Sequence, residues 1–175
     1  VARDPAVTLV SPRDLKRRTW GSEQGRFATL HALAHIEANA VNLALDAVHR
    51  FGSMPADYYA DWTSVAAEEL AHFLLLSERM AAFGGRYGDL GCHDGLWEIA
   101  ERTAADVARR MGLVPLVFEA RGLDVTPGLI ERFERHDDPE TAAVLRRVLA
   151  DEVGHVSIGH RWSHHVCAEP GLEVW

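Results

Sequence analysis

The sequence has few cysteines, no long apolar segment and no excess of basic residues. Its two cysteines, Cys92 and Cys167, are too few for a disulfide framework and lack the close spacing of a thiolate metal site. No apolar run approaches the roughly 20 residues that a membrane-spanning helix needs, and we recognise no signal peptide. A net charge of −8 disfavours nucleic acid as a partner. We therefore expect a cytoplasmic protein that contacts neither membrane nor nucleic acid.

The alternation of apolar and polar residues that marks β-strands is also missing, so the sequence predicts an all-α fold. Apolar residues instead recur at offsets of three and four, which is the period of helices packed on one side. Pro115 falls inside the third expected helix and predicts a kink one turn before Glu119. The four main helices are expected at about 22–50, 55–83, 94–123 and 138–167, with a short extra helix at 129–135.

A length of 175 residues is typical of one domain. We expect a four-helix bundle over residues 22–167, preceded by a basic arm at 1–21 and followed by a tail at 168–175. The arm carries five lysine or arginine residues and two aspartates. Two interpretations fit these charges, a solvated segment or a contact for an anionic substrate or partner.

Two similar pentapeptides are the strongest functional signal in the chain. Glu68-Glu69-Leu70-Ala71-His72 and Asp151-Glu152-Val153-Gly154-His155 share the pattern acid-Glu-x-x-His. Residues three apart share a helix face, so each motif directs one carboxylate and one imidazole at the same point. Two such helices, with one inward Glu from each of two others, supply the ligands of ferritin-like di-iron and di-manganese bundles.

Glu37 and Glu119 supply the two further carboxylates. Glu37 precedes Glu69 by 32 residues and Glu119 precedes Glu152 by 33, which suggests two helical hairpins related by a pseudo-two-fold axis. Buried carboxylates are costly without a partner, and divalent cations between the hairpins would offset four of them. The predicted metal ligands are therefore Glu37, Glu69, His72, Glu119, Glu152 and His155.

Carboxylate-rich ligation with one imidazole for each metal suits iron or manganese better than structural zinc. We expect two iron ions, with manganese as the alternative. The leading acids of the motifs, Glu68 and Asp151, lie about 100° around each helix from the ligand glutamates. They are placed to accept the remaining N–H of the histidine on the opposite hairpin, which would fix its tautomer. The alternative is that both are solvated acids.

Tyr58, Trp62 and Trp162 share the faces of the proposed ligands. These aromatic residues either line a substrate channel, carry electrons or fill the bundle core, which is their more frequent role. Gly154 and Gly159 flank His155, and their missing side chains either leave a cavity or allow close helix packing. Five further histidines fall away from the site faces and are expected on the surface or in packing, with a polar role open for the first two: His31, His35, His160, His164 and His165.

Several segments closely resemble a bacterial ferritin-like family that is catalogued as a domain of unknown function. The resemblance rests on 31–37 (HALAHIE), 67–73 (AEELAHF), 119–124 (EARGLD) and 151–156 (DEVGHV), and also on 93–98 and 159–162. It extends over nearly all of residues 12–172. It implies a ferritin-like bundle with a dinuclear metal site at the six predicted ligands, and it brings no assigned reaction.

The function that we expect is a dinuclear non-haem iron oxidase or oxygenase. Its partners would be O₂, a small organic substrate and an external electron donor, and a homodimer is compatible with the sequence. Four alternatives remain open: a ferroxidase or iron-storage protein, a di-manganese catalase, a tRNA-modifying hydroxylase, and a metal-stabilised interaction module. The acidic charge disfavours the hydroxylase, and the second Glu-x-x-His motif departs from the usual storage-ferritin site.

Overall fold

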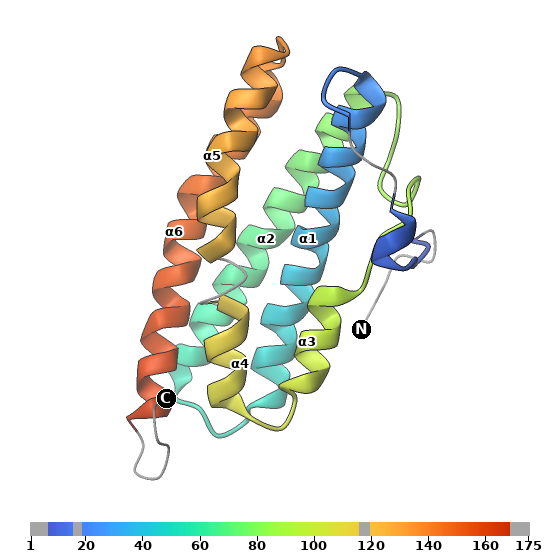
Figure 1. Cartoon of the computed structure of the whole chain (residues 1–175). Coiled ribbons are helices and arrows are strands. Elements are labelled where there is room, and N and C mark those ends of the chain that lie inside the picture. Colours follow the sequence, from blue (N-terminus) through green and yellow to red (C-terminus); the bar gives the residue numbers. More distant parts are fainter. Residues whose placement is uncertain (1–6, 16–18, 116–119, 169–175) are drawn as a thin grey trace.

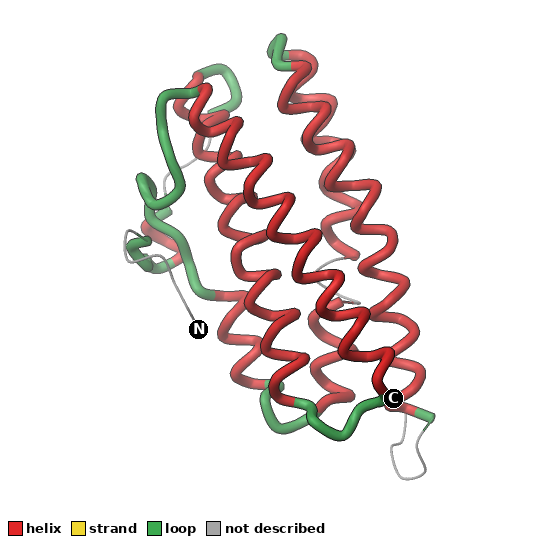
Figure 2. The backbone as a smooth tube through the Cα atoms, turned by 180° about the vertical axis from the view of Figure 1, so that it is seen from behind, coloured by secondary structure: helices red, strands yellow, loops and turns green. Residues whose placement is uncertain are grey.

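A computed structural model of the chain describes residues 7–15, 19–115 and 120–168. These residues form six α-helices and one short 3₁₀ helix, η1 (Pro12–Asp14). They contain no strand, and one isolated bridge joins Leu9 to Cys92. Figure 2 shows the helices running side by side with loops at their ends. The all-α prediction is therefore confirmed for the described part of the chain.

Helices α1 (Glu23–Arg50) and α2 (Ala56–Ala82) form the first antiparallel hairpin (Figure 1). The Ser22 side chain caps α1 by accepting a hydrogen bond from the Gly25 N–H. At the other end, residues 51–55 turn the chain, and Pro55 precedes α2 without a side-chain cap. Both helices agree with the sequence prediction to within a residue or two at each end.

Helix α6 (Pro139–Cys167) is the longest and packs on α2, α4 and α5. The Asp138 carboxylate caps it by accepting from the Thr141 N–H, and Pro139 occupies the first turn, where no backbone donor is lost. The start signal at 138–139 was correctly predicted. Arg79 of α2 also donates to Asp138, which ties the start of α6 to the end of α2.

The single helix expected at 94–123 is wrong. The chain forms two short helices, α3 (Gly95–Arg102) and α4 (Val107–Leu113), separated by a turn. Asp106 accepts from the Arg109 N–H and so starts a new helix. The Arg110 side chain, buried behind the turn, donates to the Thr103 hydroxyl and to the Asp46 carboxylate of α1. These contacts hold the chain in the turn between α3 and α4. Local periodicity in the sequence did not indicate this turn.

The break expected at 124–128 and the separate helix at 129–135 are also wrong. A continuous helix, α5 (Ala120–Arg135), contains Pro127 in its interior. Its buried side chains Thr126, Ile130 and Phe133 recur on one face, and α5 packs extensively on α6. Packing of this amphipathic face outweighs the unfavourable propensity of proline and glycine.

Pro115 lies where the third expected helix was predicted to kink. Val114 and Pro115 have π-helical backbone geometry directly after α4, and the predicted kink before Glu119 continues into residues outside the described part of the chain. Figure 1 shows α4 and α5 lying one beyond the other along α6, so that these two short helices together occupy the position beside α6. The second hairpin of the bundle is therefore built from three helices.

Two large apolar clusters fill most of the interior, and a third, smaller one contains Leu43, Ala100 and Val114. One of the two large clusters contains Tyr58, Trp62 and Trp162, and the other contains Leu30, Leu76 and Phe133. On each of α1, α2 and α6, members of the two clusters flank the glutamates singled out by the sequence. The polar centre thus lies between two apolar cores. No helix among the described residues is long and apolar enough to cross a bilayer.

Candidate metal centre

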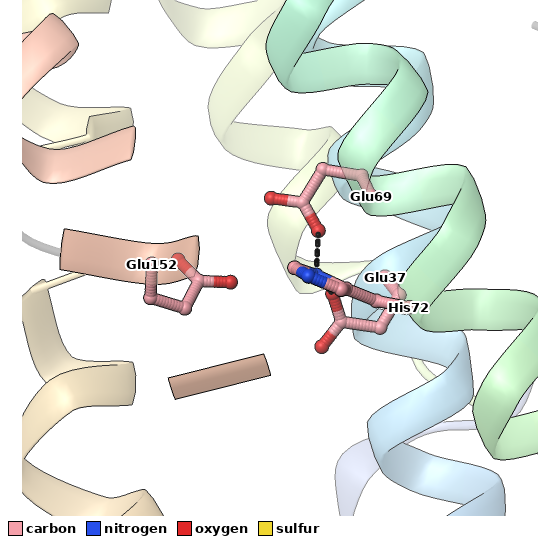
Figure 3. Close-up of side chains that lie close together, drawn as sticks. All are labelled: Glu37, Glu69, His72 and Glu152. Atoms are coloured by element: carbon pink, nitrogen blue, oxygen red, sulfur yellow. Dashed lines mark ion pairs between the residues drawn. The ribbon is translucent and has the colours of Figure 1, made fainter. Parts of the chain in front are cut away.

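Four acidic and imidazole side chains meet between α1, α2 and α6 (Figure 3). Glu37 comes from α1, Glu69 and His72 from α2, and Glu152 from α6. One potential ligand atom from each lies within 4.8 Å of all the others, and all four residues are buried. Figure 3 shows Glu152 reaching from α6 toward the cluster on α1 and α2.

The imidazole of His72 faces two of these carboxylates. Its Nδ1 lies 3.5 Å from Glu37 Oε2 and 3.4 Å from Glu69 Oε2. His155 completes the arrangement from α6, with its Nδ1 3.0 Å from Glu69 Oε1 and 3.5 Å from Glu152 Oε2. Both histidines therefore present the same ring nitrogen to the centre, and Glu69 lies between them.

The outer nitrogens of the two rings contact carboxylates of the opposite hairpin. His72 Nε2 donates to Asp151 Oδ2 at 3.1 Å, and His155 Nε2 donates to Glu68 Oε2 at 2.8 Å. With its N–H on Nε2, each ring leaves the Nδ1 lone pair for the centre. The structure thus brings Glu68 and Asp151 to the histidines that the sequence analysis assigned to them.

The inner atoms of the cluster lack hydrogen-bond partners. Buried polar atoms are nearly always hydrogen bonded, so a group of orphaned ones needs another partner. Cations satisfy carboxylate oxygens and imidazole nitrogens together, and three carboxylates with two imidazoles match the ligands of Fe or Mn. The residues present therefore fit a metal. Among the described residues the orphaned site atoms are Glu69 Oε2, His72 Nδ1, Glu152 Oε2 and His155 Nδ1.

Without a cation, the cluster balances its own charge by shifting protons. Burial, and then the neighbouring Glu69, raises the pKa of Glu37 well above its usual value. Burial alone would lower the pKa of both histidines, but the surrounding carboxylates outweigh it. The nearby carboxylates of Glu37 and Glu69 raise the pKa of His72 to about 10. Those of Glu152 and Glu69 raise the pKa of His155 to about 11.

Glu119 lies outside the described residues, so its position relative to the cluster stays a prediction. The aromatic residues proposed for a channel, Tyr58, Trp62 and Trp162, pack against one another at the apolar core. Ring centroids are 6.2 Å apart for Tyr58 and Trp62 and 5.2 Å apart for Tyr58 and Trp162.

The two glycines beside His155 have different surroundings. A Cβ added at Gly159 would collide with the ring of Pro115, so the turn after α4 packs directly on the α6 backbone there. Close packing is therefore the role of Gly159. Gly154 faces open space, with no atom of another residue within 4 Å of an added Cβ.

His31 and His35 lie away from the centre and hold the 86–93 loop. The Nε2 of His31 accepts from the backbone N–H groups of Gly88 and Leu90. His35 Nδ1 lies 2.7 Å from the Tyr87 hydroxyl. These buried histidines thus anchor a loop to α1, while His160, His164 and His165 are exposed.

Arg147 is a site residue that the sequence analysis did not single out. Its Nε donates to Asp151 Oδ2 at 2.7 Å, from one turn earlier on α6. The i, i+4 spacing of Arg147 and Asp151 was the available signal. A surface hollow of about 240 Å³ between α2 and α6 brings solvent to this position, and it is lined by Ala71, His72, Leu74, Leu75, Glu78, Arg147 and Asp151.

The described fold and site define an all-helical protein with a buried glutamate and histidine cluster that is suited to a metal. The chain belongs to the family described as "Protein of unknown function (DUF455)", which matches residues 1–175. A protein of Haemophilus influenzae described as "Uncharacterized protein" is 46% identical over 173 residues. That match covers 95% of this chain and 60% of the relative, so the chain spans less than two thirds of the relative's length. No solved structure matches the chain.

Proposed function

We propose that the protein is a ferritin-like dinuclear metal enzyme, a di-iron oxidase or oxygenase that uses O₂ to oxidise a small organic substrate. The observation that supports this most is the set of four orphaned inner atoms on two matching Glu-x-x-His motifs. Two iron ions bound there would supply the redox chemistry of O₂ activation, with electrons from an external donor.

The protein residues would then provide coordination and orientation. Glu37 and His72 would hold one ion, Glu152 and His155 the other, and Glu69 would contact both because its oxygens face different histidines. Glu119, from the second hairpin, would complete the set of ligands. Asp151 and Glu68 would keep the imidazoles in the Nε2–H tautomer, which leaves Nδ1 to the metal.

Low polarity around the site favours this chemistry. The apolar clusters on either side exclude water, which protects a reactive centre from side reactions. Both histidines are almost fully buried, at 1% and 0% exposure. Access for O₂ needs only small fluctuations of the packed side chains, whereas a larger substrate requires an opening next to the centre.

Anaerobic loading with Fe²⁺ followed by metal analysis and O₂ exposure tests the proposal. We expect two iron ions per chain and O₂ consumption by the reduced protein. Glu69→Gln should lose both properties, because it removes the carboxylate shared by the two ions. The exposed Glu101→Gln variant on α3 serves as the matched control and should behave like the wild type.

Failure of the wild-type chain to bind more than trace metal would contradict the proposal. Circular dichroism of Glu69→Gln must show an intact helical fold, so that loss of metal is not loss of structure. Loading with Mn²⁺ and assaying peroxide disproportionation in the same preparation distinguishes a catalase from an oxidase. High turnover of peroxide without O₂-dependent oxidation would replace the oxidase by the catalase.

A further inference from the structure

The proposed metal centre has two halves, one at His72 and one at His155. They differ in the contacts that hold the carboxylate behind each histidine. In the His72 half, Asp151 Oδ2 accepts from His72 at 3.1 Å and from Arg147 at 2.7 Å. The same oxygen therefore holds the imidazole on one side and is held by an arginine on the other. Arg147 and Asp151 lie one turn apart on α6, so the helix itself keeps them together.

The His155 half lacks this second support. His155 donates to Glu68 at 2.8 Å, but the Glu68 side chain is 46% exposed, against 23% for Asp151. The position one turn before Glu68 is occupied by Ser64, which is exposed and uncharged. Among the described residues no arginine forms an ion pair with Glu68, and Arg147 affects it only from a longer distance.

We propose that Arg147 is a positioning residue that makes the His72 half the tighter of the two metal positions. This inference rests on the dinuclear metal site proposed above. A carboxylate that receives the outer N–H of a ligand histidine fixes the ring and strengthens it as a ligand. The Asp151 carboxylate is restrained by both His72 and Arg147. Glu68 has a longer side chain and must lose more rotamer freedom to hold His155.

The charge of Arg147 supports this role as well. The positively charged guanidinium of Arg147 lies against the Asp151 carboxylate and so holds it in place as the acceptor of the His72 N–H. The hollow beside it admits water, which competes for the carboxylate once the arginine is removed. Metal ions should consequently bind in order, first beside His72 and then beside His155.

Calorimetry with Co²⁺, a redox-stable probe of the same sites, tests the inference. We expect the wild type to bind two ions with affinities that differ by about 10-fold or more. Asp151→Asn should weaken the tighter site by about 10- to 100-fold, as is typical when the partner of a ligand histidine is lost. Arg147→Gln, which acts through Asp151, should weaken the same site to a smaller extent. The weaker site should keep its affinity.

Two further variants test whether the effect depends on the position of the arginine or on positive charge alone. Arg146→Gln removes the neighbouring arginine, which pairs with Glu134 on α5, and should leave both affinities unchanged. Ser64→Arg places an arginine one turn before Glu68, at the position equivalent to Arg147. It should strengthen the weaker site and bring the two affinities closer together.

Proton NMR of the Co²⁺-loaded protein gives a readout that a general loss of stability would not change. The imidazole N–H signals of the metal-bound histidines shift far from the other resonances. In Arg147→Gln, one of the two signals should exchange faster with solvent while the other keeps its wild-type rate. Thermal unfolding of the metal-free variants must match the wild type.

The possible failures are distinguishable. Equal wild-type affinities overturn the inference, and so does an Arg147→Gln variant that weakens both sites equally or neither. Either result leaves the proposed dinuclear function intact. If the wild-type chain does not bind two ions at all, the proposed function fails and the inference fails with it.

Discussion

Glu69 has a position that no other described carboxylate of the centre shares. Its Oε1 lies 3.0 Å from His155, and its Oε2 lies 3.4 Å from His72. Burial opposes ionisation of this residue, but the neighbouring Glu37 and both histidines outweigh it and lower the pKa of Glu69. A carboxylate that stays ionised between two imidazoles is suited to bridge two cations.

Metal binding should release protons from the histidines. Their pKa values of about 10 and 11 mean that both rings are protonated at pH 7 in the metal-free protein. A cation must displace those protons, so its apparent affinity should rise as the pH increases from about 6 toward 10. We expect at least two protons to be released for each pair of ions, measured by calorimetry in buffers with different ionisation enthalpies.

The exposed His160→Gln variant is the control for this measurement. His160 lies on α6 away from the centre, so its removal should leave the proton count unchanged. A binding enthalpy that does not depend on the buffer would show that the rings are already neutral and would contradict the expected displacement.

At the residue scale, helical periodicity carried most of the information about the centre. The three-residue spacing in each motif was enough to predict that Glu69 and His72, and likewise Glu152 and His155, face one point. The crossed contacts of Glu68 and Asp151 followed from the same geometry. Arg147 was overlooked because an i, i+4 ion pair on a helix is usually a weak surface feature. Only its contact with an acid that holds a histidine gives it a role.

At the scale of the helices, Gly159 and Gly154 offer a matched pair of substitutions with opposite expected effects. Gly159→Ala should destabilise the protein by about 1–3 kcal/mol, because its Cβ would collide with Pro115 and push the turn after α4 away from α6. Gly154→Ala should instead stabilise it by about 0.5–1 kcal/mol, since alanine fits the open space and favours the helix.

Urea denaturation followed by circular dichroism measures both changes. Equal effects of the two substitutions would show that α4 does not press on α6 at Gly159. Both glycines lie on α6, about 7.5 Å apart at 1.5 Å per residue, so the two substitutions are compared within the same helix.

The helices that were predicted correctly begin or end at strong local signals. Ser22 and Asp138 cap α1 and α6 with their side chains, and glycines follow α2. The segment 94–135 was predicted poorly because its boundaries depend on distant residues. Arg110 fixes the turn between α3 and α4 through Asp46 of α1, and contacts with α6 keep α5 helical through Pro127. Such tertiary effects leave little trace in the local sequence.

At the scale of the whole molecule, the two apolar cores are separated by a layer of charge. Carboxylates in this layer lie where a helical bundle ordinarily places apolar side chains, and their burial opposes folding. The metal-free protein therefore lacks part of the stability that its helix packing would otherwise supply.

We expect metal removal to lower the melting temperature. A ligand present at 100 times its dissociation constant stabilises the folded state by about 2.7 kcal/mol. For a chain of this size that corresponds to a shift of about 5–10 °C. Differential scanning calorimetry before and after chelation measures the shift, and Glu69→Gln should show little or none. A melting temperature unaffected by chelator in the wild type would contradict the expectation.

The crossed hydrogen bonds also have a consequence for the order of assembly. His72 on α2 is oriented by Asp151 of α6, and His155 on α6 is oriented by Glu68 of α2. Neither hairpin carries an intact half-site by itself, because the acid that orients its histidine belongs to the other one. A nascent chain that has completed only α1 and α2 thus has no competent site. If the centre binds metal as proposed, tight capture would follow the docking of the hairpins and would come late in the maturation of the protein.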